Sequence, residues 1–172
     1  MTSPWVTPAK AGAQALCALA MSMAVAHAAD ATFTVKQLTP ETALKAAQAA
    51  LAKCRAGGFQ VTVVVVDRAG LTQALLRDRF AGAHTLEVAT NKAWSAASFR
   101  NSTAELERAT RPGTSMAGLR QVPRVTTIAG GLTIEAGGTL VGAIGVSGAP
   151  GGEADEACAV AGVKAIAEEL EF

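Results

Sequence analysis

The residues of this chain best suited to chemistry are a histidine and a glutamate one helical turn apart, His84 and Glu87. The periodicity of residues 84–99 predicts a helix, so both side chains lie on a polar stripe that continues through Asn91 and Ser95. An imidazole and a carboxylate at this spacing can share a metal ion, or the carboxylate can orient the imidazole for ligation or proton transfer. A solvated helix face has the same pattern.

Charged residues also stand where a predicted strand ends, just ahead of this helix. A ligand that carries carboxylates would find Arg77 and Arg79 there, on either side of Asp78, and the free N–H groups at the start of the helix would add to the attraction. A surface charge cluster that flanks a hairpin is the alternative. Lys92 lies off the main polar stripe of the helix, so it either contacts the ligand or extends over the helix surface.

A strand predicted over residues 139–147 contains glycines at Gly142 and Gly145, and Gly148 follows it. Glycine weakens a strand interior because it has no side chain to pack. The pattern therefore predicts that something approaches the strand backbone closely, either a packed helix or a ligand. Gly145 and Ser147 are the candidate ligand contacts on this strand.

The remaining patterns predict helices and strands in an order typical of α+β domains. Thr39 and Pro40 begin a helix that Gly57 and Gly58 end. The β-branched run at 61–66 predicts a strand buried on both faces, and a turn at 67–70 leads into a second strand. Further along we expect a short helix capped by Ser102, a loop at 111–124, short strands at 125–128 and 132–135, and a closing helix at 153–170. The expected fold is an antiparallel sheet of about five strands flanked by helices.

Residues 1–28 have the composition of a secretory signal, with Lys10 ahead of a short apolar run and Ala-His-Ala at 26–28 as the cleavage site. Residues 29–172 then form one domain in the periplasm or outside the cell. Without Lys10 the domain has equal numbers of acidic and basic residues, 14 of each. This balance gives no electrostatic reason to expect nucleic acid or a membrane as a partner.

Two cysteines, Cys54 and Cys158, remain after removal of the signal. In an exported protein the pair can form a disulfide that closes a loop of about a hundred residues. Each cysteine also falls on the apolar side of a predicted helix, where a free thiol packs as a small hydrophobic group. The sequence leaves both alternatives open.

Several segments together resemble the GlcG/HbpS family of haem-binding proteins, which is related to the C-terminal domain of PduO adenosyltransferases. The resemblance rests on residues 63–70 (VVVVDRAG), Arg77-Asp78, residues 86–89 (LEVA) with Lys92-Ala93, and residues 142–148 (GAIGVSG) followed by Asp155-Glu156. It spans about residues 38–166. It implies a three-layer α-β-α, profilin-like arrangement and assembly into homo-oligomers.

The resemblance also implies a function: an exported protein that binds haem or another tetrapyrrole and takes part in haem handling or degradation. His84 would then be the iron ligand, and Arg77 and Arg79 would pair with the haem propionates. The alternative is a small enzyme or metal-binding protein that acts on a small organic acid, with His84 and Glu87 as the metal or proton-transfer pair.

Overall fold

The computed structural model describes Met1 and residues 31–171. The predicted signal segment, residues 1–28, and its cleavage site lie outside the described residues, apart from Met1. The described residues of the N-terminal unit, 1–34, contain no helix or strand, and residues 35–172 form the second compact unit. No helix in the described part of the chain is long and apolar enough to cross a membrane.

The second unit is built on one antiparallel sheet of four strands in the order β2-β1-β4-β3. The central strands are β1 (Thr62–Asp67) and β4 (Thr139–Ser147), and the edge strands are β2 (Thr72–Arg77) and β3 (Gly131–Ala136). Every residue of β1 is buried, which confirms the prediction of a central strand from its β-branched run. The α+β fold class is therefore confirmed.

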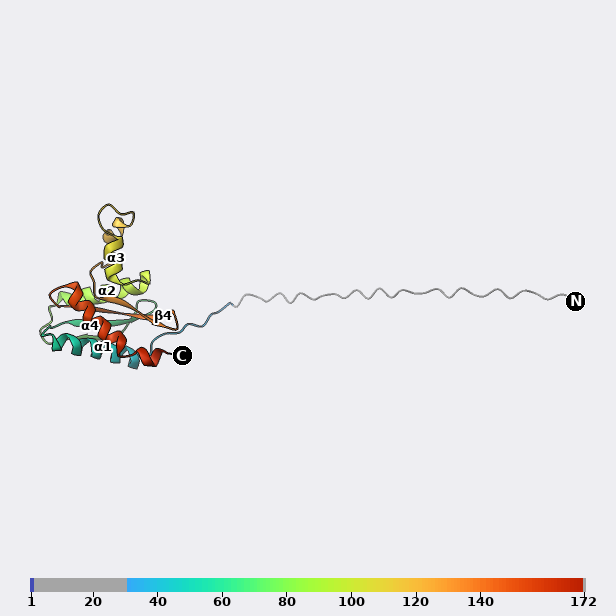
Figure 1. Ribbon diagram of the computed structural model, residues 1–172, viewed down its shortest axis with the longest axis horizontal. Coiled ribbons are helices and arrows are strands. Elements are labelled where there is room, and N and C mark those ends of the chain that lie inside the picture. Colours follow the sequence, from blue (N-terminus) through green and yellow to red (C-terminus); the bar gives the residue numbers. More distant parts are fainter. Residues whose placement is uncertain (2–30, 172) are drawn as a thin grey trace. The chain divides into compact units, whose positions relative to one another are not determined.

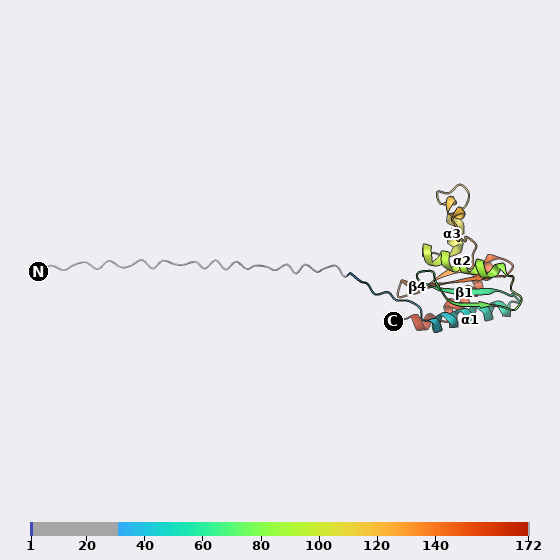
Figure 2. The same ribbon diagram turned by 180° about the vertical axis from the view of Figure 1, so that it is seen from behind.

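Helices cover both faces of the sheet and produce three layers (Figures 1 and 2). One face carries α1 (Pro40–Ala56) and α4 (Gly152–Lys164), which pack on each other, and the opposite face carries α2 (His84–Phe99). The short α3 (Thr103–Ala109) follows α2, and two 3-10 helices span Ala117–Gln121 and Ala167–Leu170. The larger hydrophobic core lies under α1 and α4, and a smaller one of alanines and valines lies under α2.

Local capping explains why the helices begin where the sequence predicts. The Thr39 side chain accepts a hydrogen bond from the backbone N–H of Thr42 at the start of α1, over 3.2 Å. Ser102 accepts one from the N–H of Glu105 at the start of α3, over 3.1 Å. These bonds satisfy N–H groups that have no partner within the helix.

The prediction of about five strands is wrong by one, because residues 125–128 form no strand. The N–H of Thr126 donates to Ser95 Oγ on α2 over 2.9 Å, and Ile128 is 53% exposed. This segment therefore bonds to the helix rather than to the sheet. The closing helix is also shorter than predicted: α4 ends at Lys164, and a separate 3-10 helix follows.

The glycines of β4 allow α2 and neighbouring backbone to approach closely. A Cβ at Gly145 would lie 2.1 Å from the carbonyl oxygen of Ala89 and 2.6 Å from the nitrogen of Ala93, both on α2. A Cβ at Gly142 would lie 2.6 Å from the carbonyl oxygen of Val66. Of the two alternatives that the sequence offered for Gly145, the packed helix is the one observed.

The two remaining cysteines form a disulfide between α1 and α4. Cys54 and Cys158 are both buried, with their Cα atoms 5.5 Å apart. The bond ties together the two helices that cover one face of the sheet. It decides between the alternatives that the sequence left open.

Candidate functional site

A cleft of about 580 Å³ opens where α2 begins, β4 ends and the loop 148–152 leads into α4. Three of the residues proposed from the sequence line it: His84, Lys92 and Ser147. They come from α2 and from the last residue of β4, and the sheet brings these two elements together because α2 packs directly on β4. The cleft therefore brings together three of the seven residues that the sequence proposed.

His84 is the first residue of α2, and its ring is exposed at the cleft. The ring lies over Gly82, where a Cβ would come within 2.7 Å of the histidine Cε1. The helix start is held to the sheet by Thr85, whose hydroxyl donates to the Gly82 carbonyl over 2.6 Å and lies 2.7 Å from the Thr62 hydroxyl on β1. These contacts place the imidazole on a fixed element with open space beside it.

Two large apolar side chains share the lining of the cleft with His84. Phe80 is 82% exposed and Ile128 is 53% exposed. Burial of such side chains against an apolar ligand is favourable, at about 25 cal/mol for each Å² removed from water. The cleft thus offers apolar walls beside a nitrogen ligand.

Lys92 and Asp155 form a buried ion pair in the lining of the same cleft. Lys92 is 1% exposed, so the prediction that it extends over the helix surface is wrong. Its Nζ donates to Asp155 Oδ2 over 2.7 Å and to the carbonyl oxygen of Val146 over 2.9 Å. Burial lowers the pKa of Lys92, although the charge and hydrogen bond of Asp155 act to raise it. Burial raises the pKa of Asp155, although the charge and hydrogen bond of Lys92 act to lower it.

Asp155 is the site residue to which the sequence reasoning assigned no role. It lies in the first turn of α4, and its Oδ1 accepts from the N–H of Ala149 over 3.0 Å. Two features of the sequence are consistent with the Lys92–Asp155 ion pair. Lys92 lies off the polar stripe and next to the alanines of α2, and Asp155 stands one turn before Cys158 on the buried face of α4.

Glu87, Arg77 and Gly145 do not line the cleft. Glu87 is exposed on the first turn of α2. Among the residues that the structure describes, no group of three or more histidine, cysteine, aspartate or glutamate side chains is placed to hold a metal ion. The Arg77 guanidinium donates to the carbonyl of Ala81, which links the end of β2 to the segment before α2.

Asp78 is buried and bonded to α1. The Arg55 guanidinium, at the last turn of α1, donates two hydrogen bonds to its carboxylate, each 2.8 Å long. These bonds hold the pKa of Asp78 at about 2, well below its ordinary value. Asp78 therefore joins the end of β2 to α1, and it does not line the cleft that contains His84.

The Asp78 carboxylate should make the protein sensitive to strong acid. Because its folded pKa is depressed to about 2, the pair stabilises the fold fully above pH 4, and this stability is lost as the pH falls from about 4 to 2. In Asp78→Asn the decrease in Tm over this pH range should be smaller than in the unchanged protein. An equal decrease in both proteins, measured by circular dichroism, would contradict this assignment.

Known proteins are similar to this chain in both sequence and fold. A family model described as haem degrading protein HbpS-like matches residues 38–164. An uncharacterized 15.0 kDa protein of Citrobacter freundii, from the dhaT-dhaS intergenic region, is 34% identical over 116 residues, 66% of this chain and 82% of that protein.

Two crystal structures extend the likeness to the three-dimensional fold. A double mutant of Streptomyces reticuli HbpS is 34% identical, with a TM-score of 0.75 over 91% of this chain and 97% of that chain. A complex of PduOC with haem is 29% identical, with a TM-score of 0.72 over 76% of this chain and 95% of that chain. Because the family model covers well over half of the sequence, the chain belongs to the HbpS-like family.

Proposed function

We propose that this protein binds haem in the cleft at the start of α2, with His84 as the iron ligand. The observation that carries the proposal is the position of the His84 imidazole, exposed at a cleft whose walls include the exposed side chains of Phe80 and Ile128. The complex of the related PduOC with haem, and the description of the family model, support the same ligand class.

The donor set of the cleft fits a haem better than a bare metal ion. A porphyrin supplies four nitrogens to its iron, so one imidazole from the protein would be enough to hold the iron. A bare ion needs three or four protein ligands, and His84 and Glu87 provide two at most. In the described part of the chain no third ligand stands with them. This observation favours haem over the metal-binding alternative.

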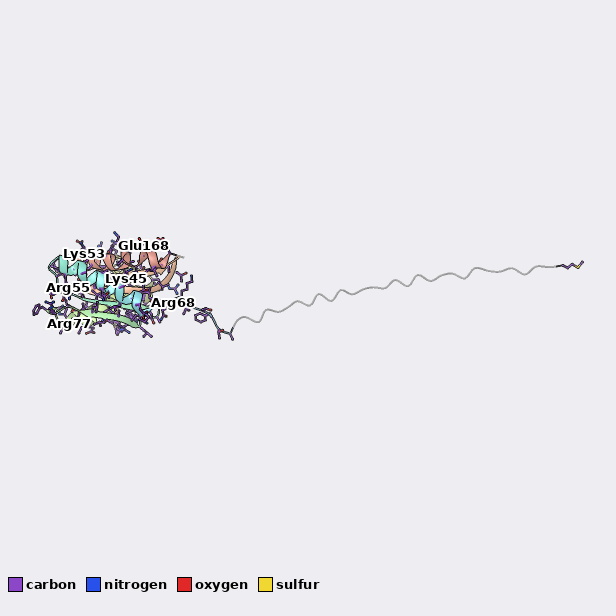
Figure 3. All side chains as sticks on the ribbon, turned by 90° about the horizontal axis from the view of Figure 1, so that it is seen from below. Lys45, Lys53, Arg55, Arg68, Arg77 and Glu168 are labelled. Carbon is purple, nitrogen blue, oxygen red and sulfur yellow. A yellow bond between two sulfur atoms is a disulfide. The ribbon has the colours of Figure 1, made fainter. Side chains whose placement is uncertain are left out.

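Residues at the cleft would hold the haem in different ways. Phe80 and Ile128 would contact the apolar edge or face of the porphyrin, and the contacts of Thr85 would keep the helix start, and with it the imidazole, in place. Arg77 does not line the cleft, but it lies at the same end of the domain as Arg55 in Figure 3 and bonds to the carbonyl of Ala81 just ahead of α2, so it is the candidate cation for a propionate. The bound haem would supply the iron and its redox chemistry.

Haem titration of the purified protein tests the role of His84. The unchanged protein should shift the Soret band of added haem, and His84→Ala should lose the shift or bind at least about tenfold more weakly, a loss of about 1.4 kcal/mol or more. Glu87→Ala is the matched control on the same helix turn and should keep the shift. His84 is the only histidine in residues 29–172, because His27 lies in the predicted signal segment.

Two results would overturn this assignment. If His84→Ala binds haem with an unchanged spectrum, His84 is not the ligand. If Glu87→Ala loses binding while His84→Ala keeps it, a carboxylate site replaces the proposed one.

The proposal includes export and self-association. The disulfide between Cys54 and Cys158 supports an oxidising compartment, the periplasm or the exterior, because disulfides rarely persist in the cytosol. Exposed leucines on the edge strand β2 and at the turn before it, Leu75 and Leu71, support contact with a second copy. Handling or degradation of haem is the physiological role that we propose for the bound state.

A further inference from the structure

The ion pair between Lys92 and Asp155 connects three elements that form the wall of the cleft. Lys92 lies on α2, and its Nζ donates to the carbonyl oxygen of Val146 on β4 over 2.9 Å. The same Nζ donates to Asp155 Oδ2 on α4 over 2.7 Å. Both partners line the cleft, and both are buried. The pair therefore acts at the point where α2, β4 and α4 meet.

Asp155 extends this connection to the loop 148–152, which borders the cleft. Its Oδ1 accepts from the N–H of Ala149 over 3.0 Å, while its Oδ2 accepts from Lys92. Three of the five loop residues are glycines, and Pro150 has no N–H to donate. A loop of this composition has a mobile backbone unless other groups hold it. The carboxylate of Asp155 supplies such a contact.

The pair also fixes the point at which the chain leaves β4. Lys92 holds the carbonyl of Val146, the residue before the end of the strand. Asp155 holds the N–H of Ala149. Residues 147–148 stand between these two bonds, and both of them line the cleft. The position of this part of the wall therefore depends on the pair.

A further segment of the wall packs directly on the pair. A Cβ at Gly130 would lie 2.7 Å from the Cβ of Asp155 and 3.0 Å from the Nζ of Lys92, so the backbone here approaches both partners closely. Two residues earlier, the same segment carries Ile128, one of the apolar side chains in the lining of the cleft. A shift of the pair would therefore also move the support of this apolar wall.

Stability by itself is a weak reason for a buried ion pair at this position. Two charges must leave water to form it, and well-packed apolar side chains in its place are often equally stabilising or more so. Apolar side chains could not bond the carbonyl of Val146 or the N–H of Ala149, however. The contribution that only the polar pair can make is therefore a fixed backbone geometry at the cleft.

We propose that Lys92 and Asp155 are positioning residues of the haem cleft. Through their hydrogen bonds and packing they hold residues 128–130 and 147–152 in place relative to His84 on α2. The inference rests on the proposed function, because haem is the ligand that these walls would enclose. Neither residue is the iron ligand, so loss of the pair should weaken haem binding without replacing His84 at the iron.

Amide hydrogen exchange of the protein without haem tests whether the pair holds the wall. The test variant is Lys92→Met with Asp155→Leu, which leaves no unpaired charge and should keep the fold. Exchange at Ala149, measured on peptides that cover residues 147–152, should be at least about tenfold faster than in the unchanged protein, because the loop has lost its bond to α4. Exchange in β1 should not change.

Haem titration of the same variant tests whether the wall matters for the ligand. The affinity should fall at least about tenfold, a loss of about 1.4 kcal/mol or more. The Soret band of the bound haem should keep the position that it has in the unchanged protein, because His84 still ligates the iron. A loss of stability alone would not separate the affinity from the spectrum in this way.

A milder variant keeps the test decisive if the double variant does not fold. In Asp155→Asn the side chain has one oxygen where the carboxylate has two, so it accepts from Lys92 or from Ala149 in the present geometry but not from both. Both measurements should change in the same direction as in the double variant, by a smaller factor.

Leu51→Ala is the control for a general loss of stability. Leu51 is buried in the core under α1 and does not line the cleft, so its truncation leaves a cavity far from the pair in the fold. It should leave the exchange of residues 147–152 and the haem affinity unchanged. Equal effects in Leu51→Ala and in the double variant would overturn the proposal, and so would a double variant with the exchange or the haem affinity of the unchanged protein.

This proposal and the haem proposal can fail separately. If the unchanged protein gives no Soret shift, haem binding is overturned, and the exchange rates alone then decide whether the pair holds the cleft wall. If loss of the pair changes neither exchange nor affinity, Lys92 and Asp155 are not positioning residues, whereas His84→Ala still decides the iron ligand.

Discussion

Lys92→Met is expected to lower the free energy of unfolding by about 3–5 kcal/mol, the cost typical of breaking a buried pair by removing one partner. The change removes the donor to Asp155 Oδ2 and to the Val146 carbonyl, and both acceptors remain buried. Methionine has a similar length and packs well, so the lost hydrogen bonds account for most of the effect. Urea unfolding followed by circular dichroism measures the difference.

Two further variants separate the pair from general damage to the helices. Lys164→Met replaces an exposed lysine on α4 and should stay within about 0.5 kcal/mol of the unchanged protein. The double variant Lys92→Met with Asp155→Leu should recover a large part of the loss, because an apolar replacement of both partners leaves no unpaired charge. If the single Lys92→Met variant is as stable as Lys164→Met, the pair contributes nothing to the fold.

Removal of the disulfide between Cys54 and Cys158 is the second change that should lower the free energy of unfolding by a large amount. The bond joins residues 104 positions apart, so in the chain-entropy model it stabilises the native state by about 4.7 kcal/mol through the unfolded chain. The double variant Cys54→Ala with Cys158→Ala should lose about this amount in urea unfolding. Asp155, which lines the cleft, lies one turn before Cys158 on α4. The double variant should therefore also make this part of the cleft lining less rigid.

Reductant provides the control for this prediction. Dithiothreitol should lower the urea midpoint of the unchanged protein close to that of the double variant, and it should leave the variant unaffected. Equal midpoints for the unchanged protein with and without reductant would show that the bond does not stabilise the fold.

The local elements could be predicted because their signals lie within a few residues of sequence. The predicted helix at 84–99 has the observed bounds of α2, and Thr39 and Ser102 cap their helices as expected. A β-branched run places β1 at the centre of the sheet. In each case a short-range pattern of burial or hydrogen bonding determines the element, and no distant residue is needed.

Elements that depend on a distant partner were predicted less well. Residues 125–128 have the composition of a strand, but Ser95 on α2 takes the N–H that a neighbouring strand would need. Asp78 was assigned to the ligand because it follows a strand end, whereas Arg55 on α1 holds its carboxylate. The competing partner is far away in sequence, so no local pattern reveals it.

By itself, the sequence determined the family, the α+β class, the exposed histidine at the start of a helix and the glycines that admit close packing. Tertiary structure alone decided that α2 covers Gly145, that the two cysteines bond, and that Lys92 points inward to Asp155 across 63 residues of chain. The physical reason is that the cost of burying a charge depends on whether a partner is present. That partner is supplied by the packing of α4 and not by the neighbours of Lys92 in sequence.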